Sequence, residues 1–324
     1  MKAIQFKEYG DPSVLENVDV DVPELDKGEV LLKVTAIGVN YADTARREGA
    51  YVVPTPLPFI PGAEVVGVVE EVGEGTSKFS KGDRVVTLIG SGGYAEYVKT
   101  TEHTLISLPE NVEDETAVAL PLQGLTAYHL LTTMGRLEEG ESVLVHAAAG
   151  GVGSLAVQLA KSFGAGNVIA TASTEEKLAL ASDLGADHTI NYTNENWRQE
   201  VLEATGGKGV DIALEMAGGD IFHETIKCMR PFGRLVVYGV ASGEPAQMYP
   251  SGLMNRNLSV MGFFLPQIMK KRELFEKSLN HLMELVQSGE LKLTVGGVYD
   301  LKDASYVHEI MQGRKTKGKL VLKP

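Results

Sequence analysis

A glycine-rich segment, residues 140–153, carries the strongest chemical signal in the sequence, and its loop begins where a strand ends at Ala147. Its spacing is Ala148-x-Gly150-x-x-Gly153, with alanine where the usual dinucleotide-binding fingerprint has its first glycine. An apolar strand precedes the loop and a helix follows it, so free N–H groups and partial positive charge at the helix start can bind a pyrophosphate. Within a series of strand–helix units this pattern predicts a dinucleotide site, and a turn used only for packing is the alternative. The residues expected to contact the cofactor here are Gly150, Gly151, Val152 and Gly153.

The next strand, residues 167–172, is expected to deliver the group that meets the adenosine ribose. An NAD-binding chain places a carboxylate about 20 residues after the glycines. Here Ser173 stands at that position, no carboxylate ends the strand, and Lys177 follows within one helical turn. A hydroxyl and an ammonium suit a 2′-phosphate, whereas an aspartate would repel it. The strand end therefore favours NADPH, with Ser173 and Lys177 as contacts, unless Lys177 is an ordinary solvated helix residue.

The elements around this loop alternate between strands and helices. Strands are expected at 143–146, 167–172, 188–192, 210–215, 234–240 and 258–265, and helices at 152–163, 175–184, 195–205 and 222–229. This alternation predicts parallel βαβ units with helices on both faces of one sheet. The first third of the chain instead has short strands at 2–6, 30–39, 65–72, 84–89 and 94–99, bounded by turn residues. That spacing predicts an antiparallel barrel or sandwich, to which a last strand at 319–323 returns.

Composition limits the classes of protein that fit the chain. The 324 residues are 44% hydrophobic and 23% charged, which is ordinary for a globular protein of about two domains. The net charge of −13 repels phosphate backbones and anionic membranes, so we expect no nucleic-acid and no membrane partner. Cys228, the single cysteine, is expected in the core rather than in a disulfide or a zinc cluster. The N-terminus is charged where a signal peptide needs an apolar core, which predicts a cytoplasmic protein.

With these patterns in place, the sequence resembles the zinc-free quinone oxidoreductases of the medium-chain dehydrogenase/reductase superfamily, the relatives of zeta-crystallin. The resemblance rests on the block Gly140-Glu141-x-x-Leu144-x-x-x-Ala148-Ala149-Gly150-Gly151-x-Gly153-x-x-x-x-Gln158-x-x-Lys161, and on shorter blocks such as Gly38-Val39-Asn40-Tyr41-Ala42-Asp43 and Pro61-Gly62-Ala63-Glu64. It implies an α/β fold in which a GroES-like β-barrel catalytic domain, residues 1–123 and 266–324, encloses a Rossmann doubly wound parallel sheet, residues 124–265. It also implies that NADPH binds in the cleft between these domains.

The resemblance further implies reduction without zinc. Zinc-dependent relatives place a ligand cysteine where this chain has Asn40 and a ligand histidine where it has Ala63. The groups expected at the substrate are then the Asn40 amide, which could donate to a carbonyl oxygen as charge develops, and the Tyr51 hydroxyl. Asparagine is also a preferred helix N-cap, so Asn40 could cap a helix at 41–47, and Tyr51 could be a loop packing residue. Ala45 stands where several relatives have a second pocket tyrosine, which makes the pocket roomier.

Further cofactor contacts are expected by position. The resemblance implies that Thr126 opens a helix near the cofactor's phosphates. It also gives Arg314 the place of a cofactor-contacting arginine, although Arg314 could be one of a solvated basic cluster. Three residues follow strands at the carboxyl edge where such sheets bind ligands, namely Tyr192, Gly239 and Phe264. Tyr192 could stack on the adenine or touch the 2′-phosphate.

Together these features predict an NADPH-dependent oxidoreductase that passes hydride or electrons to a quinone or a similar electron-poor carbonyl compound. 2-Alkenals and enoyl thioesters, which accept hydride at a conjugated carbon, are the alternative substrates. The rival from another class is a low-turnover NADPH-binding protein with a structural or RNA-binding role, against which the negative charge counts.

The apolar segment 258–265 comes last in the strand–helix series and is expected at the sheet edge. An exposed apolar edge strand is a template for pairing with another chain. A two-fold axis there would join two copies into one sheet, and the resemblance also points to a homodimer. The alternative is a monomer in which a helix near 274–285 covers the edge.

Overall fold

The computed structural model describes all 324 residues, which form two compact units. Unit 1 comprises residues 1–122 and 294–324, and unit 2 comprises residues 123–293. The chain therefore passes between the units twice, at 122–123 and at 293–294. Residues 266–293, expected in the first domain, lie with unit 2 in the structure, because Ser278 and His281 pack against a helix of that unit.

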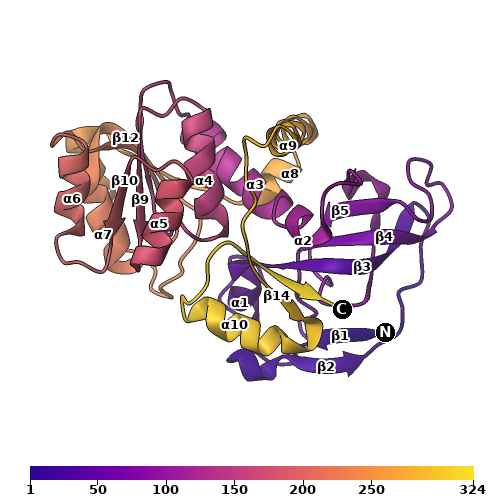
Figure 1. The fold of residues 1–324 in the computed structure, drawn as a ribbon. Coiled ribbons are helices and arrows are strands. Elements are labelled where there is room, and N and C mark those ends of the chain that lie inside the picture. Colours follow the sequence, from indigo (N-terminus) through magenta and orange to yellow (C-terminus); the bar gives the residue numbers. More distant parts are fainter. The chain divides into compact units, whose positions relative to one another are not determined.

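Unit 2 is built on a six-stranded parallel sheet with the order β10–β9–β8–β11–β12–β13 (Figure 1). The strands are β8 (Ser142–Val145), β9 (Asn167–Ala172), β10 (His188–Asn191), β11 (Val210–Glu215), β12 (Met229–Val237) and β13 (Ser259–Gly262). Counted along the chain, this is the 3-2-1-4-5-6 order of the Rossmann fold, with its switch point between β8 and β11. The predicted doubly wound parallel sheet is confirmed.

Helices cover both faces of this sheet (Figure 1). On one face lie α4 (Gly151–Ser162) and α5 (Glu175–Asp183), and on the other lie α6 (Trp197–Ala204) and α7 (Gly219–Cys228). Every residue of β11 is buried, as expected for a parallel strand covered from both sides. Cys228 packs in the same core as Trp197 and Phe222, which confirms its predicted place.

Three further helices belong to the region around this series: α3 (Pro121–His129), α8 (Leu265–Met269) and α9 (Arg272–Gln287). His129 Nε2 of α3 lies 3.0 Å from Ser278 Oγ of α9, which holds the two helices together. The prediction that Thr126 opens a helix is wrong. The helix begins at Pro121, whose fixed φ suits a first helical position, and Thr126 lies buried within it.

Unit 1 contains a seven-stranded sheet that is antiparallel except at one edge. Its path is β14–β15–β3–β4–β5–β7, and β6 pairs with β3. The strands are β3 (Glu29–Val39), β4 (Glu64–Val72), β5 (Arg84–Leu88), β6 (Tyr97–Thr101), β7 (Leu105–Ser107), β14 (Val295–Asp300) and β15 (Lys319–Lys323), and β1 (Lys2–Gln5) and β2 (Glu16–Asp19) form a separate pair. Because β15 pairs with β3, the last strand returns to the first domain as predicted.

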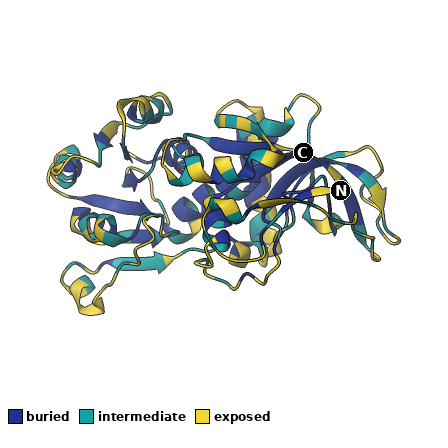
Figure 2. Cartoon of the chain, turned by 90° about the horizontal axis from the view of Figure 1, so that it is seen from below, coloured by how far each residue is buried: buried dark blue, intermediate teal, exposed yellow.

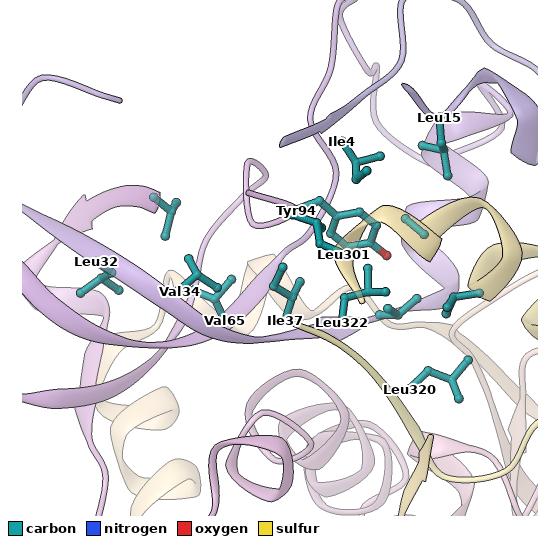
Figure 3. Packing of buried hydrophobic residues seen from close by; sticks show 14 of the residues in the cluster. Ile4, Leu15, Leu32, Val34, Ile37, Val65, Tyr94, Leu301, Leu320 and Leu322 are labelled. Atoms are coloured by element: carbon teal, nitrogen blue, oxygen red, sulfur yellow. The ribbon is translucent and has the colours of Figure 1, made fainter. Parts of the chain in front are cut away.

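The core of unit 1 combines side chains from both ends of the chain. Figure 3 shows Ile37 and Val65 beside Leu320 and Leu322, with Tyr94 above them. The helices of this unit are α1 (Tyr41–Arg47), α2 (Asp114–Ala117) and α10 (Ala304–Gln312). In Figure 2 the strands are largely buried and the outward helix faces are exposed. None of the helices has the length and apolar character needed to span a membrane.

Candidate functional site

The glycine loop joins β8 to α4 at the switch point of the unit 2 sheet. Gly150 is the N-cap of α4, and the Ser154 N–H donates to Gly150 O at 2.9 Å. The N–H groups of residues 151–153 precede that bond, at the end of the helix where the dipole is positive. A methyl group on Gly153 would lie 2.3 Å from Ala147 O, so only glycine lets α4 approach β8 this closely. The loop is therefore a cradle for an anionic group such as a pyrophosphate.

The residues predicted for the ribose end lie at the neighbouring strand ends. Ser173 follows β9 directly and Tyr192 follows β10, and the Tyr192 N–H donates to Ala172 O at 3.1 Å. Lys177 is half-buried in the first turn of α5, where its N–H donates to Thr174 Oγ1 at 3.4 Å. The structure thus brings a hydroxyl, an ammonium and an aromatic ring to one part of the carboxyl edge.

On the other side of the switch point, Gly239 and Phe264 lie just beyond the ends of β12 and β13. The loop after β11 rests against Gly239, because a methyl group there would be 3.1 Å from Met216 O. The same carbonyl accepts the Ala241 N–H at 2.8 Å. Both predicted residues therefore share the carboxyl edge with the glycine loop.

In unit 1, Asn40 belongs to a buried polar cluster with Glu64 and Lys319. Lys319 Nζ donates to Asn40 Oδ1 at 2.9 Å and pairs with Glu64 Oε1. Asn40 Nδ2 donates to Glu64 Oε1 at 2.9 Å and to Gly38 O at 3.2 Å. The Lys319 and Glu64 side chains are 0% exposed. A substrate carbonyl could take an N–H of this amide by replacing the longer bond, the one to Gly38.

Asn40 fills the predicted capping role. It is the N-cap of α1 and forms a capping box with Asp43, and its backbone N–H donates to Asp43 Oδ2 at 2.9 Å. Burial raises the pKa of Asp43 to about 6, although the N–H groups of Asn40 and Gly62 favour its ionised form. The Asn40 side chain therefore belongs both to the capping box and to the polar cluster.

Tyr51 follows α1 and packs against Arg46. The guanidinium carbon lies 4.2 Å from the centre of the Tyr51 ring, and Arg46 Nη1 donates to Thr55 Oγ1 at 3.3 Å. Burial raises the pKa of Tyr51, so its hydroxyl remains protonated at neutral pH and can donate a hydrogen bond. The geometry is compatible with both the packing role and the donor role.

The remaining predicted contacts belong to elements other than the strand ends of the unit 2 sheet. Arg314 follows α10 in unit 1, is exposed, and has a left-handed backbone with φ 55°. Thr126 lies within α3, and Asn40 and Tyr51 flank α1 in unit 1. The structure therefore gathers the glycine-loop and strand-end residues at one sheet edge, and the two predicted substrate groups around α1.

Sequence reasoning missed three buried charged groups: Glu64, Lys319 and Glu215. Glu64 and Lys319 each begin an apolar strand, and Glu215 ends one. A charge in such a strand is the signal that could have identified them. Glu215 Oε1 accepts the N–H groups of Ala217 at 2.6 Å and Gly218 at 2.9 Å, which fixes the loop after β11. Burial raises the pKa of Glu215.

The positions of the zinc ligands of zinc-dependent relatives hold Asn40 and Ala63. An amide and a methyl group provide neither the thiolate nor the imidazole that a tight zinc site needs. Across residues 1–324, no three His, Cys, Asp or Glu side chains gather to hold a metal ion. Metal independence nevertheless stays a prediction.

Known proteins are similar to this chain over its full length. Residues 26–110 match the family described as alcohol dehydrogenase GroES-like domain, and residues 151–284 match the family described as zinc-binding dehydrogenase. The chain is 37% identical to a 2-haloacrylate reductase of Burkholderia sp, covering 100% of this chain and 99% of the relative. It is 35% identical to the quinone oxidoreductase of Homo sapiens, covering 99% of this chain and 97% of that relative. The solved structure of Escherichia coli quinone oxidoreductase complexed with NADPH is 34% identical, with a TM-score of 0.95 over 100% of both chains.

Proposed function

The chain belongs to the quinone oxidoreductase family of the medium-chain dehydrogenase/reductase superfamily, and on this premise we propose that it is an NADPH-dependent reductase of quinones or similar electron-poor carbonyl compounds. The observation that carries the proposal is the glycine cradle at the switch point, where a Cβ on Gly153 would clash with Ala147 O. The NADPH bound to the Escherichia coli relative supports the choice of cofactor.

We assign the cofactor-binding residues as follows. The N–H groups at the start of α4 would hold the pyrophosphate, and Ser173 and Lys177 would hold the 2′-phosphate. Tyr192 would lie at the adenosine end, and Gly239 and Phe264 at the nicotinamide end of the same edge. Thr126 and Arg314 remain expected contacts. When bound, NADPH supplies the hydride, and the chain supplies binding and orientation.

Lys177→Ala tests the assignment of the 2′-phosphate site. The unaltered chain is expected to bind NADPH at least tenfold more tightly than NADH, about 1.4 kcal/mol. Lys177→Ala is expected to weaken NADPH while leaving NADH nearly unchanged, as measured by fluorescence titration. Lys227→Ala, which removes an exposed lysine of α7, is the matched control. If the unaltered chain binds NADH as tightly as NADPH or more tightly, the assignment of the 2′-phosphate site is wrong.

The substrate end is assigned to Asn40 and Tyr51. An amide N–H and a protonated hydroxyl can donate to a carbonyl oxygen as negative charge builds up on it. Because Asn40 and Ala63 replace the zinc ligands of zinc-dependent relatives, we propose that this donation takes the place of a Lewis acid. Exhaustive chelation should leave turnover intact, and activity restored specifically by zinc would refute this part of the proposal.

A second candidate substrate class is the conjugated alkene. The 2-haloacrylate reductase similar to this chain acts, by its name, on an alkene conjugated to a carboxylate. This favours testing 2-alkenals, enoyl thioesters and 2-haloacrylates beside quinones. The relative rates of NADPH oxidation with each acceptor decide between the classes.

The rival from another class is an NADPH-binding protein with little turnover and a structural or RNA-binding role. Its net charge of −13 argues against RNA. NADPH binding without oxidation by any acceptor in the panel would favour this rival. A cytoplasmic location remains our expectation from the sequence.

We further propose that the protein is a homodimer joined through β13. This strand lies at the edge of the unit 2 sheet, with Val260 and Met261 only half-buried. The segment leading into it exposes Tyr249 (81%) and Met254 (73%), an apolar surface of the kind that interfaces cover. The helix expected to cover the edge in a monomer, α9, packs Ser278 against His129 of α3.

Light scattering at micromolar concentration tests the dimer. A mass near 34.8 kDa would reject it. Met261→Pro should halve the doubled mass, because proline cannot donate to a strand ladder. Retained NADPH binding by this variant would show that the sheet itself is intact.

A further inference from the structure

We infer that Lys319 and Glu64 form a positioning pair, which sets the Asn40 amide for the reaction. The inference rests on the proposed function. It assigns a role to two residues outside the cofactor-binding edge, each contributed by a different strand of unit 1.

The pair fixes which way the Asn40 amide faces. An ammonium can only donate hydrogen bonds and a carboxylate can only accept them. With Oδ1 at 2.9 Å from Lys319 Nζ and Nδ2 at 2.9 Å from Glu64 Oε1, a half-turn of the amide would bring like partners together. The ammonium also draws electron density from the amide, which strengthens the N–H that faces Gly38 as a donor.

The surroundings show that the pair is built into the sheet rather than left at its surface. Both side chains are 0% exposed. A methyl group on Gly38 would lie 2.5 Å from Glu64 Oε1 and 2.7 Å from Lys319 Cε, so the backbone of β3 passes directly beside them. A buried ion pair often adds little net stability compared with apolar side chains, so its presence calls for another role.

The Glu64 carboxylate also holds the end of the first segment of unit 1. Glu64 Oε2 accepts the N–H of Leu122, the last residue of that segment, at 2.9 Å. The Lys319 main-chain N–H donates to the carbonyl of Thr294 at 2.8 Å, a backbone bond that does not use the Lys319 charge. The Glu64 side chain therefore binds both the Asn40 amide and the Leu122 main chain.

The role assigned here is positioning, because the pair acts through Asn40. Its loss should lower kcat more than it changes NADPH binding, since the glycine loop, Ser173 and Lys177 belong to unit 2. The test is a double-mutant cycle of Lys319→Met and Asn40→Ala. The matched control is Lys323→Met. Lys323 lies on the same strand as Lys319, and the substitution removes its surface ion pair with Glu115 of α2.

We expect Lys319→Met to lower kcat at least tenfold, the size typical of a lost hydrogen bond to a charged group. The NADPH dissociation constant should stay within about twofold, and Lys323→Met should leave kcat within about twofold, the scale of a surface pair. In the Asn40→Ala background, Lys319→Met should lower kcat little further. An equal loss of kcat in both backgrounds would overturn the inference.

The double variant Lys319→Met/Glu64→Gln guards against misfolding, because removing one charge alone leaves its partner buried and unpaired. Its readout is NMR of the Asn40 side-chain amide, assigned by the signal lost in Asn40→Ala. We expect slow hydrogen exchange of that amide in the unaltered protein and much faster exchange in the double variant. Unchanged protection would overturn the inference. This readout needs no turnover, so it is decisive even where no acceptor is reduced and the proposed function fails.

Discussion

At the carboxyl edge of unit 2, the groups that can meet a cofactor are mostly main-chain N–H groups in a loop shaped by glycine. In unit 1, the group that can meet a substrate is a side-chain amide held between buried charges, Lys319 and Glu64. The first arrangement needs close backbone approach. The second needs side chains from two strands to meet the side chain of the α1 N-cap.

This difference separates binding from chemistry within the chain. Changes at the unit 2 edge should alter cofactor affinity, because they move the N–H groups that hold an anion. Changes around Asn40 should alter turnover, because they move a donor without touching the cradle. The predictions below test that separation.

The largest effect is expected from Gly153→Ala. Its Cβ would lie 2.3 Å from Ala147 O and 2.8 Å from Ala148 Cα, so α4 must move away from β8. We expect NADPH binding to weaken at least ~100-fold, about 2.7 kcal/mol, in a fluorescence titration. Gly252→Ala, where no atom lies within 4 Å of the added Cβ, is the control in the same unit. If the two variants bind NADPH with similar affinity, the glycine loop is not the NADPH-binding site.

Acid should destabilise unit 2 through His146. This ring lies 2.8 Å from Thr171 Oγ1 and from Thr225 Oγ1, and burial lowers its pKa to about 4. The unfolded chain takes up the proton near pH 6.5, so the stability from this group is present above that pH and is lost as the pH falls towards 4. Between pH 7 and 5 the loss is about 2 kcal/mol. Glu215, whose pKa burial raises, opposes it in part.

The His146 effect can be measured by urea unfolding at pH 7 and pH 5. The fluorescence of Trp197, the single tryptophan, reports on unit 2, because its ring meets the His146 ring edge to face at 5.6 Å. His146→Gln should make the pH dependence shallower by the amount given above. His188→Gln, at an exposed position in β10, should leave it unchanged. Equal slopes for the two variants would contradict the assignment.

A smaller effect, on a different quantity, is expected from Gly38→Ala. The added Cβ would push on Glu64 and on Lys319, the two groups that orient Asn40. We expect kcat to fall about tenfold, about 1.4 kcal/mol, with NADPH affinity unchanged. Gly90→Ala adds a methyl group in open space in the same unit. A loss of NADPH affinity in Gly38→Ala would contradict the assignment of cofactor binding to unit 2 and of turnover to the groups around Asn40.

Tyr51→Phe should have the smallest effect. The ring remains against Arg46 and only the hydrogen bond of the hydroxyl is lost, so stability should fall by no more than about 1 kcal/mol. Loss of the hydroxyl should raise KM for the acceptor about threefold, the scale of one neutral hydrogen bond. Unaltered steady-state kinetics would assign Tyr51 to packing alone.

Local patterns were enough to predict the parallel strand–helix series of unit 2. The glycine spacing, the strand ends at Ser173 and Tyr192, and the strand–helix alternation are all visible within short windows. They did not place residues 266–293, which the structure adds to unit 2. Glu64 and Lys319 are 255 residues apart, and no spacing rule brings them to Asn40. The predicted start of α3 at Thr126 was also wrong. The helix begins five residues earlier, at Pro121.

The most direct test of the proposed reductase activity is NADPH oxidation by the metal-chelated protein with a quinone, a 2-alkenal, an enoyl thioester and a 2-haloacrylate in turn. We predict oxidation in proportion to the acceptor consumed for at least one of them, and much slower oxidation by Asn40→Ala at full NADPH occupancy. Tight NADPH binding with no acceptor-dependent oxidation by the unaltered protein would contradict the proposal.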